Sequence, residues 1–256
     1  MIFEDLLDRG RRALEEDDSR SALQQLREAI KLKQTPEAWL LLAEAQLEEN
    51  QLSQAQKSVT AGLETDKDNV DLLYLSADID LEEEKVAAAL QAYRRIIEID
   101  PEQIDARVNQ ALLELDADKL DSAEQTCREA LQYEPESVLA LNALGDICIA
   151  GGDDRQALDC YLRALEIDPE EPQTYLNLAD LYYETEQLPQ AEEACCKALE
   201  LDAGLALAYL TLGYIYMDLD RTQAAVDNFQ QFLKLEKNPS AKQIRDEVKA
   251  VIDGLK

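Results

Sequence analysis

Apolar and polar residues follow one another with the period of a helix, in paired stretches that short polar breaks separate. Between residues 174 and 184 the apolar or aromatic side chains are Tyr175, Leu178, Ala179 and Tyr182. After a polar break, a second stripe consists of Leu188, Ala191, Ala194, Cys195, Ala198 and Leu199. Apolar positions spaced by i, i+3, i+4 and i+7 are typical of an amphipathic helix. The pattern therefore predicts two amphipathic helices joined by a short turn.

The helix pair recurs along the chain at a fixed interval. One alanine position recurs every 34 residues, except that its first two copies are 33 residues apart. These alanines are Ala22, Ala55, Ala89, Ala123, Ala157, Ala191 and Ala225. A small side chain at every copy indicates a close approach of two helices. Prolines after the second helix share the interval, at Pro101, Pro135 and Pro169. A copied element of this length predicts a repeat protein, in which each pair buries its apolar face against its neighbours.

Composition argues against several kinds of protein. Hydrophobic residues make up 46% of the 256 positions, and no run approaches the roughly 18 apolar residues that a membrane-spanning helix needs. The first residues lack the basic region and apolar core of a signal peptide, so we expect a cytoplasmic location. The chain has no histidine, and it has no zinc-ligand spacing or phosphate-binding glycine loop. We therefore expect no enzyme activity, no cofactor and no metal site.

Charge is the extreme property of this sequence. The 55 acidic residues outnumber the 25 basic ones, which gives a formal net charge of −30. Such a surface repels nucleic acid and anionic membranes, so we expect neither as a partner, and we expect no membrane insertion.

The repeat resembles the tetratricopeptide repeat family, whose 34-residue pattern places aromatic, Leu-Gly, Tyr, Ala and Phe residues at set offsets. One copy matches it with Tyr209, Leu212, Gly213, Tyr216, Ala225 and Phe229. Another copy has Leu141, Leu144, Gly145, Ala157, Tyr161, Ala164 and Pro169. A third opens with the family's tryptophan, at Trp39.

The resemblance implies an all-α, right-handed superhelical solenoid of seven helix-turn-helix repeats, forming one continuous domain over residues 1–256. The predicted repeats cover residues 3–35, 36–69, 70–103, 104–137, 138–171, 172–205 and 206–239. Residues 240–256 carry Ile244, Val248, Val251 and Ile252 on one helical face. We expect this segment to be the helix that caps the last repeat, since an uncovered repeat would expose an apolar face to water.

Some repeats depart from the family pattern at positions that normally lie in the core. Asp80 replaces the tyrosine of the third repeat, and Arg107 and Glu114 replace the aromatic and tyrosine of the fourth. Since buried charges need partners, we expect these three side chains to form a half-buried cluster and to weaken the junction between repeats three and four.

The cysteines divide between core positions and positions beside the core. Cys127 and Cys195 take the family's Phe position and Cys148 takes its Tyr position, so we expect buried, inert thiols there. Cys160 and Cys196 fall one step off the predicted core.

In the family, the first helix of each repeat lines the concave side of the superhelix and exposes the second, fifth, sixth, ninth, twelfth and thirteenth positions. Here acids dominate the second, ninth and thirteenth positions, and apolar residues fill the twelfth. The residues that we expect to bind a ligand are Glu37, Glu44, Glu48, Asp71, Asp78, Glu82, Asp105, Asn109, Leu115, Asp116, Asp146, Asn177, Asp180, Tyr183 and Glu184. No lysine or arginine stands at a second or sixth position, so the family's clamp for acidic C-terminal tails is absent.

The acidic and apolar residues at these positions predict a noncatalytic scaffold or adaptor that binds a basic, partly apolar segment rich in Lys and Arg. Two alternatives stay open. One is an assembly protein that associates with itself, and the other is a bacterial substrate-holding chaperone or biogenesis factor. The acidity also fits a surface adapted to salt or simply to solubility.

Overall fold

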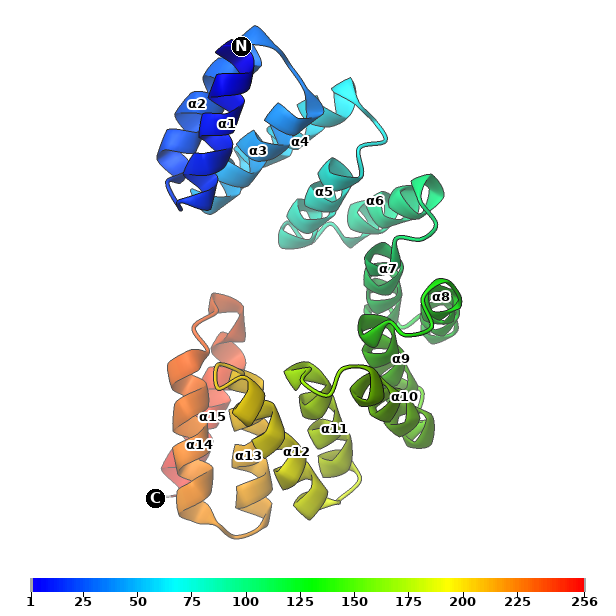
Figure 1. The fold of residues 1–256 in the computed structure, drawn as a ribbon. Helices are drawn as coiled ribbons and strands as arrows, with labels where there is room; N and C mark the ends of the chain where they lie inside the picture. The colour runs from blue at the N-terminus through cyan, green and yellow to red at the C-terminus, as the bar shows by residue number, and fades with distance from the viewer. Residues whose placement is uncertain (1, 256) are drawn as a thin grey trace. The chain divides into compact units, whose positions relative to one another are not determined.

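The computed structural model describes residues 2–255, and these residues form helices joined by short turns, with no strand among them (Figure 1). The helices are α1 Ile2–Glu15, α2 Ser19–Leu32, α3 Pro36–Glu48, α4 Leu52–Thr65, α5 Val70–Glu82, α6 Val86–Ile99, α7 Ile104–Asp116, α8 Leu120–Tyr133, α9 Val138–Ala150, α10 Asp154–Ile167, α11 Pro172–Glu184, α12 Leu188–Leu201, α13 Ala206–Asp218, α14 Thr222–Leu235 and α15 Lys242–Leu255. A short 3₁₀ turn, Pro239–Ala241, precedes α15. The prediction of an all-α repeat fold is confirmed.

The chain divides into two compact units, Met1–Lys119 and Leu120–Lys256, which we call the N-terminal and C-terminal units. The division falls in the turn between α7 and α8, inside the fourth predicted repeat. The expectation of one continuous domain stays a prediction.

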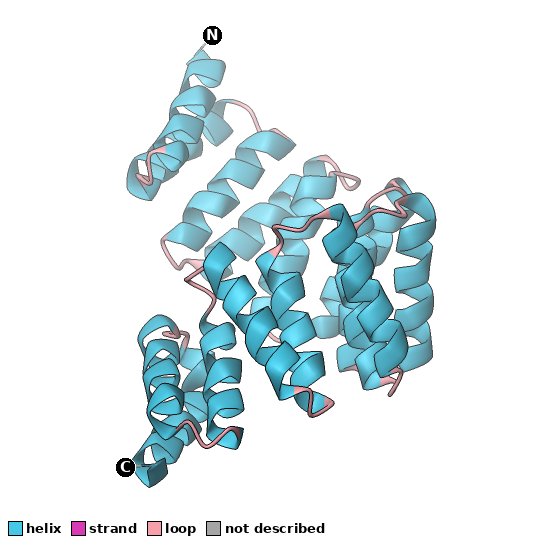
Figure 2. Ribbon diagram, turned by 60° about the horizontal axis from the view of Figure 1, so that its bottom comes forward, coloured by secondary structure: helices cyan, strands magenta, loops and turns pink. Residues whose placement is uncertain are grey.

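Within each unit, two kinds of neighbour contact repeat. The first helix of a hairpin packs on the second, as in α3 with α4 or α11 with α12, and the second packs on the first helix of the following repeat. First helices of successive repeats also touch, as α3 does with α5 and α9 with α11. Figure 2 shows how short the connecting loops are relative to the helices. First helices therefore share one surface of each unit, which we call the first-helix face.

Local chemistry explains where the first helices begin. The Thr35 hydroxyl accepts a hydrogen bond from the backbone N–H of Ala38 at 3.2 Å, and the Asn69 side chain accepts one from Leu72 at 3.0 Å. Side-chain acceptors of this kind satisfy the N–H groups that the first turn of a helix leaves without partners. Pro36 occupies the first turn of α3, where its missing N–H carries no penalty.

Every hairpin reverses direction at a residue with positive φ. The residues are Asp17, Asn50, Glu84, Asp118, Gly152, Glu186 and Asp220, with φ between 55° and 77°. This left-handed conformation ends a helix and is strained for residues other than glycine. Gly152 alone among the seven meets that requirement without strain.

The core is built from the small residues of the repeat pattern. All seven recurring alanines are fully buried, at 0% exposure. Gly145 is buried against the ring of Tyr161, and a Cβ at that glycine would overlap the ring. The predicted cap is confirmed, because Val248 and Ile252 of α15 are buried in one cluster with Phe229 and Phe232 of α14.

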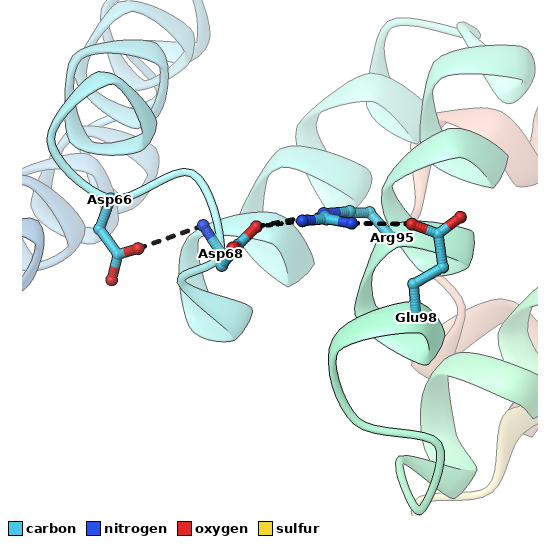
Figure 3. A network of polar contacts seen from close by, with 4 residues as sticks. All are labelled: Asp66, Asp68, Arg95 and Glu98. Atoms are coloured by element: carbon cyan, nitrogen blue, oxygen red, sulfur yellow. Dashed lines mark hydrogen bonds and ion pairs between the residues drawn. The ribbon is translucent and has the colours of Figure 1, made fainter.

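Charged bridges between a second helix and a turn of a neighbouring repeat connect successive repeats. In Figure 3, Arg95 of α6 donates from Nε to Asp68 Oδ1 at 3.2 Å and from Nη1 to Glu98 Oε2 at 2.8 Å. Asp68 lies in the turn before α5, where its backbone N–H donates to Asp66 Oδ1 at 3.2 Å. A similar bridge joins Arg221 to Glu192 at 2.8 Å in the C-terminal unit. Exposed pairs of this kind stabilise only weakly.

The charged residues that replace core positions are buried rather than half-buried, and the structure gives Arg107 and Glu114 several partners. Asp80, Arg107 and Glu114 expose 8%, 7% and 2% of their surface. Glu114 accepts a hydrogen bond from Gln110 at 2.8 Å, and Arg107 Nε donates to the Pro101 carbonyl at 3.1 Å. These contacts satisfy buried charges that would otherwise be costly.

Asp80 has a different environment from Arg107 and Glu114. Burial raises the pKa of its carboxyl, and the nearby cation that lowers this pKa is Lys85 of the same repeat.

The expectation for Cys160 is wrong. Cys127, Cys148 and Cys195 are buried and Cys196 is exposed, as predicted, but Cys160 is only 2% exposed. The reason is that α10 packs on more than one side, and Cys160 lies near Cys148 of α9 and Cys127 of α8. A helix covered on two faces buries positions that a one-faced pattern assigns to solvent.

Candidate functional site

All the residues that the sequence predicts for binding lie on first helices, from α3 to α11, and none belongs to the buried core. The exposed ones are Glu37, Glu48, Asp71, Asp78, Glu82, Asp105, Asp116 and Glu184. The half-buried ones are Glu44, Asn109, Leu115, Asp146, Asn177, Asp180 and Tyr183.

In the N-terminal unit, the acids of neighbouring first helices lie close enough to interact. Burial raises the pKa of Glu44 on α3, and the charges of Glu48 and of Asp71 on α5 raise it further. Burial also raises the pKa of Asp78, with Glu82 adding to the effect. The structure thus brings the acids of α3 and α5 together on the first-helix face, where their negative charges reinforce one another.

Two of the predicted acids already have partners within the protein. Arg11 of α1 pairs with Glu37, and the Ser19 hydroxyl donates to Glu48. Asp71, Glu82 and Asp116 have no such partner among residues 2–255. On α3 only Glu37 and Glu48 of the predicted acids have such partners among the described residues, so Glu44 and the acids of α5 and α7 stay unpaired.

The C-terminal unit holds two carboxylates in fixed positions. Asp146 Oδ1 accepts hydrogen bonds from the Tyr161 hydroxyl at 2.6 Å and from Asn177 Nδ2 at 3.2 Å. Asp180 Oδ1 accepts one from the Thr211 hydroxyl at 2.8 Å. In both residues Oδ2 has no partner among the described residues. Each carboxylate therefore keeps one oxygen bonded to the fold and the other available to a ligand.

Burial dominates the electrostatics of these two groups. It raises the pKa of Asp146, an effect that the hydrogen bond from Tyr161 opposes. It also raises the pKa of Asp180, from the ordinary 3.8 to about 6, and the charges of Glu184 and Asp146 contribute in the same direction. An added cation would relieve this accumulation of negative charge.

The three residue types of this arrangement recur in the N-terminal unit. Asn109 hydrogen bonds to the Tyr93 hydroxyl, and burial and the charge of Asp78 raise the pKa of that hydroxyl. Every member recurs 68 residues later, as Asp146, Tyr161 and Asn177. The hydrogen bonds differ, because Asn177 donates to Asp146 whereas Asn109 pairs with Tyr93. In the C-terminal unit the triad joins an Asp and a Tyr of one repeat to an Asn of the next, and it holds the Asp146 carboxylate in place.

Sequence reasoning did not identify the tyrosines of the triads or Thr211. A signal was present, since Tyr93 and Tyr161 occupy the position where the family pattern has Phe. A hydroxyl in a core position needs a hydrogen-bond partner, and only the structure shows that the partner of Tyr161 is Asp146.

Apolar side chains accompany the acids of the C-terminal unit. Leu139 of α9 and Leu207 of α13 expose 46% and 50% of their surface. Tyr183 of α11 is half-buried and its hydroxyl donates to Asp218 Oδ2 at 2.8 Å. This face therefore offers both carboxylates and apolar contacts.

Two negative findings apply to residues 2–255. No group of three or more His, Cys, Asp or Glu side chains is positioned to hold a metal ion. Within the same range, no helix combines the length and the apolar character that crossing a membrane requires.

Three family models match the chain, over five segments. Models described as "Tetratricopeptide repeat" match residues 7–55, 45–104, 172–204 and 206–239, and a model described as "TPR repeat" matches residues 145–186. No curated protein sequence matches this chain.

Solved structures with a similar fold are distant in sequence. A tetratricopeptide repeat protein from Parabacteroides merdae is 19% identical, with a TM-score of 0.83, over 99% of this chain and 98% of that one. Yeast Tom70 is 19% identical, with a TM-score of 0.73, over 99% of this chain and 53% of that one. PilF of Pseudomonas aeruginosa is 19% identical, with a TM-score of 0.63, over 84% and 96%. At this identity the similarity concerns the fold alone.

Proposed function

Because the chain belongs to the tetratricopeptide repeat family, we propose that it is a noncatalytic scaffold that binds a basic, partly apolar segment of another protein. Such a segment contacts the first-helix face of a unit, where its Lys and Arg side chains meet the carboxylates, and the two units are tested together. The expected cytoplasmic location stays a prediction.

The observation that supports this proposal best is the pair of fixed carboxylates in the C-terminal unit. Asp146 and Asp180 are half-buried, and each keeps Oδ2 without a partner among the described residues. Acids that only served solubility would gain nothing from partial burial, which costs free energy. A Lys or Arg side chain recovers part of that cost, while Leu139 and Leu207 supply apolar contact area.

The test compares two variants that carry the same change of charge. The first has Asp71→Lys, Glu82→Lys and Glu184→Lys on first helices, and these acids are exposed. The second has the exposed acids of second helices replaced, namely Glu64→Lys, Asp159→Lys and Glu166→Lys.

The probe is a fluorescein-labelled peptide of alternating Lys and Leu residues, titrated in low salt by fluorescence anisotropy. We expect the first variant to lose affinity at least about tenfold and the second to change by less than about threefold. Equal losses of affinity in both variants would mean that the peptide responds only to the overall negative charge, and that the acids serve solubility. Wild-type affinity in the first variant would refute binding on the first-helix face.

A further inference from the structure

The N-terminal unit has a groove of about 680 Å³ that is lined mostly by second helices. It lies between α2 and α4, and α3 forms its floor with Trp39, Leu42 and Gln46. Trp39 is the only tryptophan of the chain and is half-buried. Its indole N–H is buried without an acceptor among the described residues, so packing alone holds the ring. The groove thus has an aromatic floor that is partly open to solvent.

The rim of this groove is positively charged. Arg20, Arg27 and Lys31 of α2 and Lys57 of α4 line it. Arg20 pairs with Glu49 at 3.4 Å. Arg27 donates only to the neutral Gln54 Oε1, at 3.3 Å.

The remaining two cations of the rim differ from each other. Lys31 pairs with Glu28, whereas Lys57 has no ion pair among residues 2–255. Two positive charges, those of Arg27 and Lys57, therefore stay uncompensated on a chain whose formal net charge is −30.

Two comparable grooves in other repeats have no excess of positive charge among their lining residues. The groove over Tyr175, about 550 Å³, has Lys197 opposed by Glu193 and Glu200. In the groove of about 460 Å³ beside α6, two arginines face two acids, Asp80 and Glu98. The groove over Trp39 is the one among these three whose lining carries net positive charge.

We propose that the groove between α2 and α4 docks an acidic segment of a partner protein, with an aromatic or aliphatic residue of that segment packed on Trp39. Charge complementarity supports this occupant, because Arg27 and Lys57 offer donors to carboxylates while Trp39 and Leu42 offer apolar contact. Screening limits the field of distant acids to about 8–10 Å at physiological salt, so the local cations decide what binds here. An extended polyanion such as nucleic acid would reach beyond the groove onto the acidic surface and be repelled.

The charged rim of this groove lies on the second helices α2 and α4, whereas the acids of the proposed function lie on first helices. A basic partner and an acidic partner therefore have separate places on the molecule, and either binding event can be disrupted without the other.

The experiment uses Trp39 as a built-in reporter, because all tryptophan emission of this 256-residue chain comes from this groove. The probe is a synthetic peptide of about twelve residues made of Glu-Leu-Phe-Glu units, added to the whole chain. We expect a saturable change of tryptophan emission in the wild type. Arg27→Glu with Lys57→Glu should weaken affinity at least about tenfold. Both side chains are exposed, so the folded core should be unaffected, and circular dichroism checks this.

The matched control reverses two exposed cations of the same unit that lie outside the groove, Arg12→Glu and Lys67→Glu. We expect the control to retain the wild-type affinity within about twofold. Equal losses in both variants, or no loss in either, would overturn the proposal. A spectral change that depends on protein concentration without peptide would assign the groove to a second copy, and equal binding of a single-stranded oligonucleotide would assign it to general anion binding. Either result would also overturn it.

Discussion

Replacement of Asp180 by asparagine should stabilise the protein at neutral pH. The folded structure raises the pKa of this carboxyl from 3.8 to about 6, chiefly by burial. At 1.36 kcal/mol per pKa unit, holding the group ionised in the folded state costs about 3 kcal/mol. We reduce this to about 1–2 kcal/mol because Asp180 keeps some solvent contact, which screens its charge. Asparagine has no charge to desolvate, and its Oδ1 can still accept the hydrogen bond from Thr211.

The sign of the pH dependence follows from proton binding. Between about pH 4 and pH 6 the folded chain keeps a proton on Asp180 that the unfolded chain has lost. The contribution of Asp180 to the free energy of unfolding therefore falls as pH rises through this window, and stays low above it. The advantage of Asp180→Asn should be close to zero near pH 4 and reach its full value above about pH 7.

The assay is urea unfolding followed by circular dichroism, for both proteins, at several pH values from 4.5 to 8 in constant salt. Asp159→Asn is the control, because it removes the same charge from an exposed position of α10. A carbon NMR titration of the Asp180 carboxyl measures the pKa directly. The reasoning is refuted if Asp180→Asn is no more stable than the wild type at pH 7.5, or if its advantage is the same at pH 5.

Further predictions concern single contacts of the fold. Tyr161→Phe removes one donor to Asp146 and should lower the free energy of unfolding at pH 7 by about 1–2 kcal/mol; an equal loss in Tyr209→Phe, whose hydroxyl has no partner among the described residues, would contradict this. Gly145→Ala places a Cβ against the ring of Tyr161 and should cost about 1–3 kcal/mol in urea unfolding, whereas Gly254→Ala, where a Cβ meets nothing within 4 Å, should be harmless. Gly152→Ala should lower the free energy of unfolding by about 1–2 kcal/mol through its φ of 77° alone, and an unchanged melting temperature would contradict this. Hydrogen exchange should be faster in α7, where Arg107 and Glu114 are buried, than in α3; fast exchange confined to α1 and α15 would contradict the idea of a weak junction.

Sequence periodicity was sufficient to predict the helices, because each one has a local cause. The apolar stripe, the proline of α3 and the capping Thr35 all act within a few residues. The recurring alanines predicted a close contact between helices at each copy, and in the structure all seven are buried.

The environment of the acids could not be predicted in the same way, because it depends on partners far along the chain. Asp146 belongs to a position that the family exposes, and its burial depends on Tyr161 and on Asn177 of the next repeat. Cys160 was misassigned for a related reason, since it lies near Cys148 of α9 and near Cys127 of α8 in the preceding repeat. The pairing of Glu37 with Arg11 likewise required coordinates, because 26 residues separate them.

The reversal in the middle of every hairpin has a consequence for how such a chain can change over generations. Residues as different as Asp17, Asn50, Glu84 and Gly152 adopt nearly the same backbone turn, so the geometry of a hairpin depends little on which copy it is. Loss or duplication of a whole hairpin would leave the remaining turns as they are and preserve the contacts between adjacent helices. The length of this protein can therefore vary in evolution in steps of one hairpin, while its binding surfaces are tuned by substitutions within each copy.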